Sequence, residues 1–247
     1  MTIRDYITKE IKNMKDRPLK ERWEYFWDYY KWPTLCILLA IIVIIPSIVS
    51  AVTKKNPVFS GFVLNSMPLD YRTEYLEEFY AYAGIDAEND CAIFNADVSI
   101  TDGKSESDVA CLQRILASLA IKDADFVLAP SNAFHVCTYN TSNMFADLRD
   151  YLDEETLQKL EGHIYYKDAY VTEQILNHTY NTLEFPDPFK PEEMKDPIPI
   201  GIHVGESPKL HQAYLFLRTD LYIGITINTQ HPEMVLKYID FLLADCP

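Results

Sequence analysis

The sequence predicts an α/β protein: an N-terminal transmembrane helix, then a domain with a mixed, mainly parallel sheet flanked by helices. Two observations carry this prediction. Residues Leu35 to Val52 form an uninterrupted, uncharged and mostly apolar run. Beyond it, short apolar stretches typical of strands alternate with amphipathic stretches typical of helices. Such alternation favours parallel strands covered by helices.

The apolar run is long enough to cross a bilayer. It has eighteen residues, and the neighbouring residues 33, 34 and 53 extend it. At about 1.5 Å rise per residue, the segment 33–53 matches a hydrocarbon layer of about 30 Å. No polar stripe interrupts it, as one would in a core helix. Val49 and Ala51 resemble a signal-peptidase site, so cleavage is the alternative, but the 32-residue leader favours an uncleaved anchor.

Aromatic residues crowd the N-terminal flank of this run. All three tryptophans, Trp23, Trp27 and Trp32, lie there, interleaved with tyrosines that include Tyr29 and Tyr30. Amphipathic rings of this kind favour the membrane–water interface. We therefore expect these five residues to lie at the interface and the lipid bilayer to be a partner of the chain.

The distribution of basic residues predicts the orientation. Residues 1–32 carry eight Lys and Arg, whereas the first twenty residues after Thr53 carry three. Basic residues are retained on the cytoplasmic side of a membrane. The sequence thus predicts a single-pass protein of the cell membrane, with a cytoplasmic leader (1–32), a span (33–53) and an extracytoplasmic domain (56–247).

The net charge differs between the two ends of the chain. The leader carries +2 and residues 56–247 carry −19, which together with Lys54 and Lys55 gives the overall −15. An acidic exterior repels nucleic acid, so we expect no nucleic-acid partner. The acidic surface either keeps the domain soluble or favours cationic solutes.

The leader shows two amphipathic stretches. Apolar residues between Ile3 and Met14 are spaced like one helical face, Pro18 interrupts the pattern, and a second helix is expected from Leu19 to Tyr30. This pattern fits a helix lying on the membrane surface. The alternative is a docking site for another membrane subunit.

The outer domain is long enough for one sizeable core. Strands are expected at 57–65, 91–100, 125–129, 199–204 and 221–228, and helices at 71–82, 105–121, 148–160 and 232–243. Ser105 is the expected cap of its helix, and Pro130-Ser131-Asn132 a turn that begins another. Residues 138–199 are less regular, and 181–199 is expected to be a connector.

Motifs for catalysis or cofactor binding are absent. The chain has seven glycines and neither GxGxxG nor GxxxxGK[ST]. Gly205-Glu206-Ser207-Pro208 lacks the closing glycine of a nucleophile elbow. The six histidines form no HExxH, and no CxxC occurs. We expect no enzyme activity, no metal and no cofactor. Cys91, Cys111, Cys137 and Cys246 allow three disulfide pairings, or remain buried thiols.

Parts of the chain resemble a known family. Ala124 to Ser131 (ADFVLAPS) with Met144 to Leu152 (MFADLRDYL), and the closing Leu221 to Leu243, are similar to stretches of extracellular solute-binding proteins of ABC transporters. The aromatic leader with a single span resembles uncharacterised membrane-tethered proteins of Gram-positive bacteria. The resemblance covers about half of the chain. It implies a reduced periplasmic-binding-protein-like fold, in which residues 138–199 supply a small second lobe.

The resemblance also implies a ligand site. Ligands of open α/β sheets contact the loops after the strands, and the residues there are Ser131, Asn132, Ser99 and Tyr222. Helix capping by Ser131 and Asn132, and core packing of Tyr222, are the structural alternatives. We expect a tethered domain that binds a small solute or a protein. The other hypotheses are an accessory subunit docked through the leader and, least favoured, a surface hydrolase.

Overall fold

The computed structural model describes residues 18–53, 55–67, 73–140, 143–177, 184–213 and 215–244. Within the N-terminal helix, the described side chains are Lys20, Trp23, Glu24, Trp27 and those of residues 31–46. The chain divides into two compact units, Met1–Lys54 and Lys55–Pro247. The expected helix between Ile3 and Met14 lies outside the described residues.

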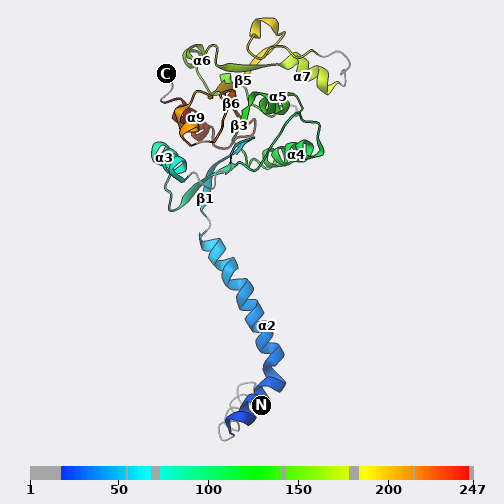
Figure 1. The fold of residues 1–247 in the computed structure, drawn as a ribbon, viewed down its shortest axis with the longest axis vertical. Coiled ribbons are helices and arrows are strands. Elements are labelled where there is room, and N and C mark those ends of the chain that lie inside the picture. The colour runs from blue at the N-terminus through cyan, green and yellow to red at the C-terminus, as the bar shows by residue number, and fades with distance from the viewer. Residues whose placement is uncertain are drawn as a thin grey trace. The chain divides into compact units, whose positions relative to one another are not determined.

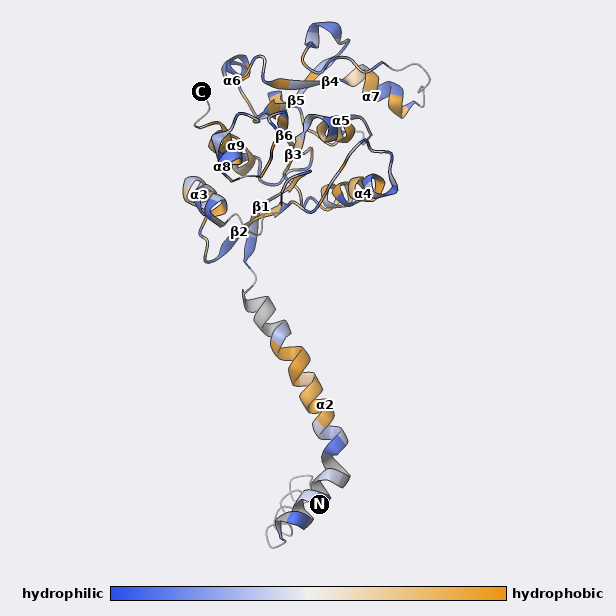
Figure 2. Cartoon of the chain, viewed as in Figure 1, coloured by the Kyte–Doolittle hydropathy of each residue, from blue (hydrophilic) through white to orange (hydrophobic). Residues whose placement is uncertain are grey.

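In the first unit the structure describes a long helix, α2 (Leu19–Thr53), which includes Pro33 and Pro46. At about 1.5 Å per residue, its 35 residues extend for about 52 Å. The expected helix start at Leu19 is confirmed, but the helix continues past Tyr30 without interruption. Figure 2 shows an apolar stretch within this helix, which in the sequence begins at Leu35. Among the described residues, no helix is both long and apolar enough to cross a membrane.

The second unit contains a six-stranded sheet (Figure 1). Its strands are β1 (Asn56–Val63), β2 (Asp90–Asn95), β3 (Phe126–Pro130), β4 (Ile164–Asp168), β5 (Pro197–His203) and β6 (Leu221–Ile225). Its helices are α3 (Thr73–Ala83), α4 (Glu106–Ala120), α5 (Ser131–Asn140), α6 (Glu154–Lys159), α7 (Ala169–Leu176), α8 (Pro208–Gln212) and α9 (Pro232–Leu243), with 3-10 turns η2 (Leu148–Asp150) and η4 (Pro191–Glu193). The α/β class with a mixed sheet flanked by helices is therefore confirmed.

The expected mainly parallel arrangement is wrong. The strand order is β2-β1-β3-β6-β5-β4. Strand β1 pairs in parallel with β2 and β3, but β3–β6, β6–β5 and β5–β4 are antiparallel. Helices α3 and α4 provide the crossovers that parallel neighbours require. The last strand, β6, instead inserts between β3 and β5 in the opposite direction, which hydrophobic periodicity does not reveal.

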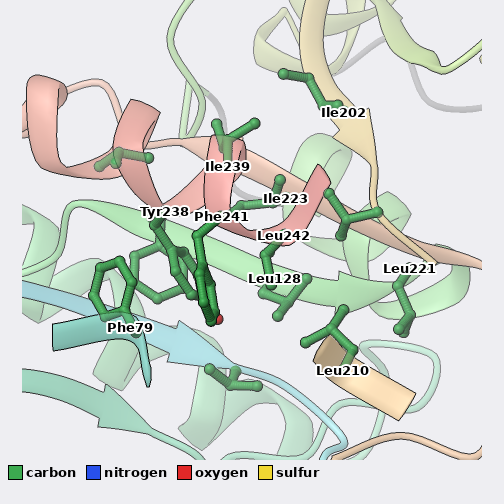
Figure 3. Close-up of a cluster of buried hydrophobic side chains, with 14 of the residues drawn as sticks. Phe79, Leu128, Ile202, Leu210, Leu221, Ile223, Tyr238, Ile239, Phe241 and Leu242 are labelled. Atoms are coloured by element: carbon green, nitrogen blue, oxygen red, sulfur yellow. The ribbon is translucent and has the colours of Figure 1, made fainter. Parts of the chain in front are cut away.

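The sheet is buried on both faces. Along β1 and β3, side chains alternate between a first core, with Phe59 and Phe126, and a second core, with Phe62 and Val127. Helices α3 and α9 cover the first core, where Phe79, Tyr238 and Phe241 pack together (Figure 3). Helices α4 and α5 cover the second. This two-sided burial explains why the central strands β3 and β6 are apolar along their whole length.

Several expected boundaries are confirmed and others shift. Helix α9 has the expected bounds, and Ser105 caps α4 by accepting the Asp108 N–H at 3.0 Å. The expected helix 148–160 is instead η2 and α6, because Asp147 and Asp153 each cap a separate turn. Strands β2 and β6 end earlier than expected. Within 138–199, β4 and the start of β5 belong to the same sheet as β1.

Candidate functional site

The sheet has a topological switch point between β1 and β3. From β1 the chain passes through α3 to β2 on one side, and from β2 it passes through α4 to β3 on the other side. In open α/β sheets, ligands bind at such a point, outside the carboxyl ends of the strands. At this end of the sheet lie the residues that follow β1, β2 and β3 and those that precede β6. We call them the switch-point edge: Asn65, Ser99, Thr101, Ser131, Asn132, Arg218 and Asp220.

Asn65 joins the loops after β1 and β2. Its Oδ1 accepts hydrogen bonds from the Ser99 hydroxyl at 2.9 Å and the Ile100 N–H at 2.8 Å, and its Nδ2 donates to the Ile100 carbonyl at 2.8 Å. The φ angle of Asn65 is 57°, a left-handed conformation that asparagine tolerates better than most residues. Sequence reasoning identified Ser99 but missed Asn65, which orients it.

Asp108 fixes the neighbouring loop from the first turn of α4. One buried carboxylate oxygen accepts the N–H groups of Thr101, Asp102 and Gly103 at 3.2, 3.1 and 2.9 Å. Burial opposes ionisation of Asp108, but these bonds and that of Ser105 outweigh it and lower its pKa. The loop is therefore preorganised by an ionised side chain.

Ser131 and Asn132 begin α5 at the end of β3. The Ser131 N–H donates to the Asp220 carbonyl at 2.8 Å, and the Asn132 side chain donates to the Thr101 carbonyl at 3.1 Å. Asn132 Oδ1 in turn accepts a long hydrogen bond, 3.4 Å, from Arg218. The side chain of Asn132 thus joins the loop after β2 to the segment before β6.

Arg218 supplies a positive charge at this edge. It pairs with both carboxylate oxygens of Asp220 at 2.5 Å, and both side chains are partly exposed. Burial raises the pKa of Asp220, but hydrogen bonding to Arg218 and its charge outweigh this and lower it. The pair presents a planar guanidinium beside neutral amide and hydroxyl groups. Such a group hydrogen-bonds carboxylates and carbonyls.

Tyr222 has a different environment from the other three expected residues. It pairs with Ala129 across β3 and β6, is 7 % exposed, and packs against Phe134 and Tyr165 in the second core. Burial raises the pKa of its hydroxyl. The structure therefore brings Ser99, Ser131 and Asn132 together at the switch-point edge and places Tyr222 in the adjacent core.

The expected interface residues lie on α2. Trp23, Trp27 and Trp32 are 67 %, 57 % and 67 % exposed, so their rings are open to the surroundings of the helix. Trp27 and Trp32 line a shallow groove with Lys31 and Leu35. Tyr29 and Tyr30 also belong to α2, but their side chains lie outside the described ones.

A hollow of about 740 Å³ lies away from the switch-point edge. It is lined by Asp168, Tyr170, Val171, Gln174, Glu184, Phe185, Pro186, Asp187, Glu193 and Lys195. Sequence reasoning missed it, because it treated residues 181–199 as a connector. The available signal was the mixture of acidic and aromatic residues within that segment, such as Glu184, Phe185 and Asp187.

Among the residues that the structure describes, the remaining polar groups are engaged in or buried by the fold as follows. Ser207 is fully buried, and its hydroxyl finds no hydrogen-bond partner among the described residues. His211 and His203 bind the carbonyl oxygens of Gly205 and Thr219, both at 2.8 Å. Within the described ranges, no group of three or more His, Cys, Asp and Glu side chains is arranged to hold a metal ion.

Cysteine burial differs along the domain. Cys91 and Cys111 are half-buried free thiols. Burial of Cys137 in the second core raises its pKa to about 12, so its thiol stays protonated at neutral pH. Cys246 lies outside the described residues.

Comparison with known proteins adds no relative. The chain matches no protein-family model, no curated protein and no solved structure.

Proposed function

We propose that this protein is a membrane-anchored, non-catalytic recognition domain that binds a small solute or a protein at the cell surface. In this proposal the segment 33–53 crosses the bilayer, the leader stays in the cytoplasm and the α/β unit lies outside. The apolar run, the tryptophans before it and the basic leader support the anchor. The resemblance to extracellular solute-binding proteins supports the recognition role.

One observation carries the proposed binding role. Four chain segments that are far apart in sequence bring Ser99, Asn132, Arg218 and Asn65 to the carboxyl ends of β1 and β3. Their hydrogen bonds hold these groups in place before a ligand arrives. Preorganised polar groups at a switch point are the usual basis of recognition in open α/β sheets.

A ligand screen tests this role on the full-length protein in detergent. A ligand that binds only the folded state raises the melting temperature. We expect a polar ligand to do so, and Asn132→Ala and Arg218→Gln to reduce the shift. Gln113→Ala, an exposed change on α4, is the matched control. Equal shifts in all four proteins would rule out binding at the switch-point edge.

A topology reporter tests the anchor. An enzyme active only in the cytoplasm, fused after Pro247, should be inactive, whereas the same enzyme fused before Met1 should be active. Strong activity from the C-terminal fusion would refute the proposed orientation.

The exposed tryptophans favour a second candidate, an accessory subunit docked through the leader and α2. Trp27 and Trp32 line a groove that suits the packing of another apolar helix. In this case a membrane protein should co-purify with the full chain and be lost on removal of residues 1–32 or on Trp27→Ala. Co-purification that survives both changes would exclude this candidate.

A further inference from the structure

The hollow beside α7 has walls from three separate parts of the chain. Helix α7 and the residue before it provide Asp168, Tyr170 and Gln174, the segment 184–187 provides a second wall, and Glu193 and Lys195 provide a third. Its volume of about 740 Å³ is within the range of small-molecule sites. Helix α7, which lines the hollow, lies apart from β1 in the ribbon (Figure 1).

Hydrogen bonds and ring contacts hold these walls together. The buried Asp168 carboxylate accepts the N–H groups of Tyr170 at 3.0 Å, Lys195 at 3.0 Å and Asp196 at 3.1 Å. It thereby joins the start of α7 to the segment before β5. The Phe185 ring packs on His135 and Tyr139 of α5, at centroid distances of 5.2 and 4.9 Å.

One of the lining residues, Lys195, carries an ammonium group. The Nζ atom of Lys195 lies 3.6 Å from the centroid of the Tyr170 ring. This is the geometry of a cation–π interaction, in which a positive charge is attracted to the electron-rich face of the ring. Tyr170 and Phe185 are 38 % and 48 % exposed, so part of each residue stays accessible beside these contacts.

Negative charge outnumbers positive charge in the lining. Asp168, Glu184, Asp187 and Glu193 line the hollow together with Lys195. Asp168 is engaged by backbone N–H groups, and Glu193 pairs with Lys190 at 2.9 Å. Glu184 and Asp187 are exposed, although one Asp187 oxygen accepts the Phe189 N–H at 3.0 Å. The charge of −19 on residues 56–247 adds to the attraction for a cation.

We propose that this hollow binds the alkylammonium group of an external amine. The amine takes the place of the Lys195 ammonium on the Tyr170 ring, and Glu184 and Asp187 supply the opposite charge. Lys195 is then an internal competitor that is displaced by the ligand. This site is independent of the proposed recognition at the switch-point edge.

Isothermal titration of the full-length protein with 1,5-diaminopentane tests the proposal. Tyr170→Leu should weaken binding roughly two- to five-fold, the size of an exposed cation–π contact. Lys195→Met should strengthen binding, because the competing ammonium is removed. Glu184→Gln with Asp187→Asn should weaken it further. The control is Glu77→Gln, which removes an exposed carboxylate from α3 on the first-core side.

Tyr170→Leu and Lys195→Met are expected to change the affinity for the amine in opposite directions, which makes the test decisive. If Lys195→Met weakens amine binding or leaves it unchanged, the proposed displacement is wrong. An equal loss in Glu77→Gln would mean that the amine binds the acidic surface without a defined site. Equal melting temperatures of the variants establish that they fold. N-acetyl-lysine methylamide, titrated in parallel, distinguishes a lysine side chain of a peptide from a free diamine as the source.

Discussion

At the scale of single residues, buried polar groups show most clearly what the fold requires. Asp108 is buried but has three backbone N–H partners, whereas Ser207 is buried without a described partner. The difference is large energetically, because an unsatisfied buried polar group retains its full desolvation penalty. The two residues therefore predict opposite responses to mutation.

Replacing Ser207 by alanine should stabilise the protein. The change removes a hydroxyl that has no described hydrogen bond, and Ser207 also makes no capping bond to α8. We expect the free energy of unfolding to rise by about 1 kcal/mol, as measured by urea denaturation. Ser105→Ala, which removes a real helix cap, should lower it by about 1 kcal/mol. A lower stability of Ser207→Ala would show that the hydroxyl has a partner.

Asp108 should make the protein sensitive to acid. The pKa of Asp108 in the folded state lies below its ordinary value of 3.8. At a pH between the folded-state and the ordinary pKa, the unfolded chain therefore binds more protons than the folded protein. The stabilisation is complete above pH 3.8 and is lost as the pH falls through the folded-state pKa. The unfolding free energy of Asp108→Asn should fall less steeply in this window. If the unfolding free energies of both proteins fall equally steeply with pH in this window, Asp108 is not the source of the acid sensitivity.

At the scale of elements, β1 depends on a residue without a side chain. Gly61 pairs with Phe94 of β2 and with Phe126 of β3. The two rings meet edge to face with centroids 5.7 Å apart. A Cβ atom at residue 61 would lie 2.1 Å from the Phe126 ring. The glycine therefore provides the space in which the aromatic first core is assembled.

Gly61→Ala should destabilise the sheet by overpacking. We expect a loss of about 1–3 kcal/mol in chemical denaturation. Because the clash is with Phe126, the loss should be smaller when Phe126→Leu is already present, and a double-mutant cycle measures this coupling. Strictly additive losses of unfolding free energy would mean that the strain does not come from the contact with Phe126.

Helices and strands were predictable where the hydrophobic periodicity and the residues typical of element ends agree. Helix α9 combines a clear apolar face with Pro232 at its start, and α4 combines one with Ser105. Strand β4 was missed, since its five residues include the buried but polar Lys167 and Asp168. Those side chains are accommodated by contacts with Asn143 and with residues 195 and 196, which are distant in sequence.

At the scale of the whole molecule, the two compact units differ in how far their apolar side chains are exposed. The unit Lys55–Pro247 buries its apolar residues in two cores, whereas the described apolar side chains of α2 from Leu35 to Ile45 are exposed. Exposed apolar surface of this kind needs a partner, which in our proposal is lipid.

The two units should therefore fractionate differently. Full-length protein is expected in the membrane fraction of a lysate, with detergent needed for its release. A protein beginning at Lys55 should be found in the aqueous fraction, because its cores are internal. Recovery of intact, unprocessed full-length protein from the aqueous fraction would contradict the proposed anchor.

Local pattern in the sequence alone determined the α/β class, most helices, the apolar run and the polar residues near the strand ends, because side-chain periodicity and capping act between near neighbours. Only the tertiary structure decided that β6 inserts antiparallel beside β3, that Asn65 and Arg218 join Ser99 and Asn132, and that Lys195 reaches Tyr170. These outcomes depend on contacts between residues far apart in the chain, which no local pattern encodes.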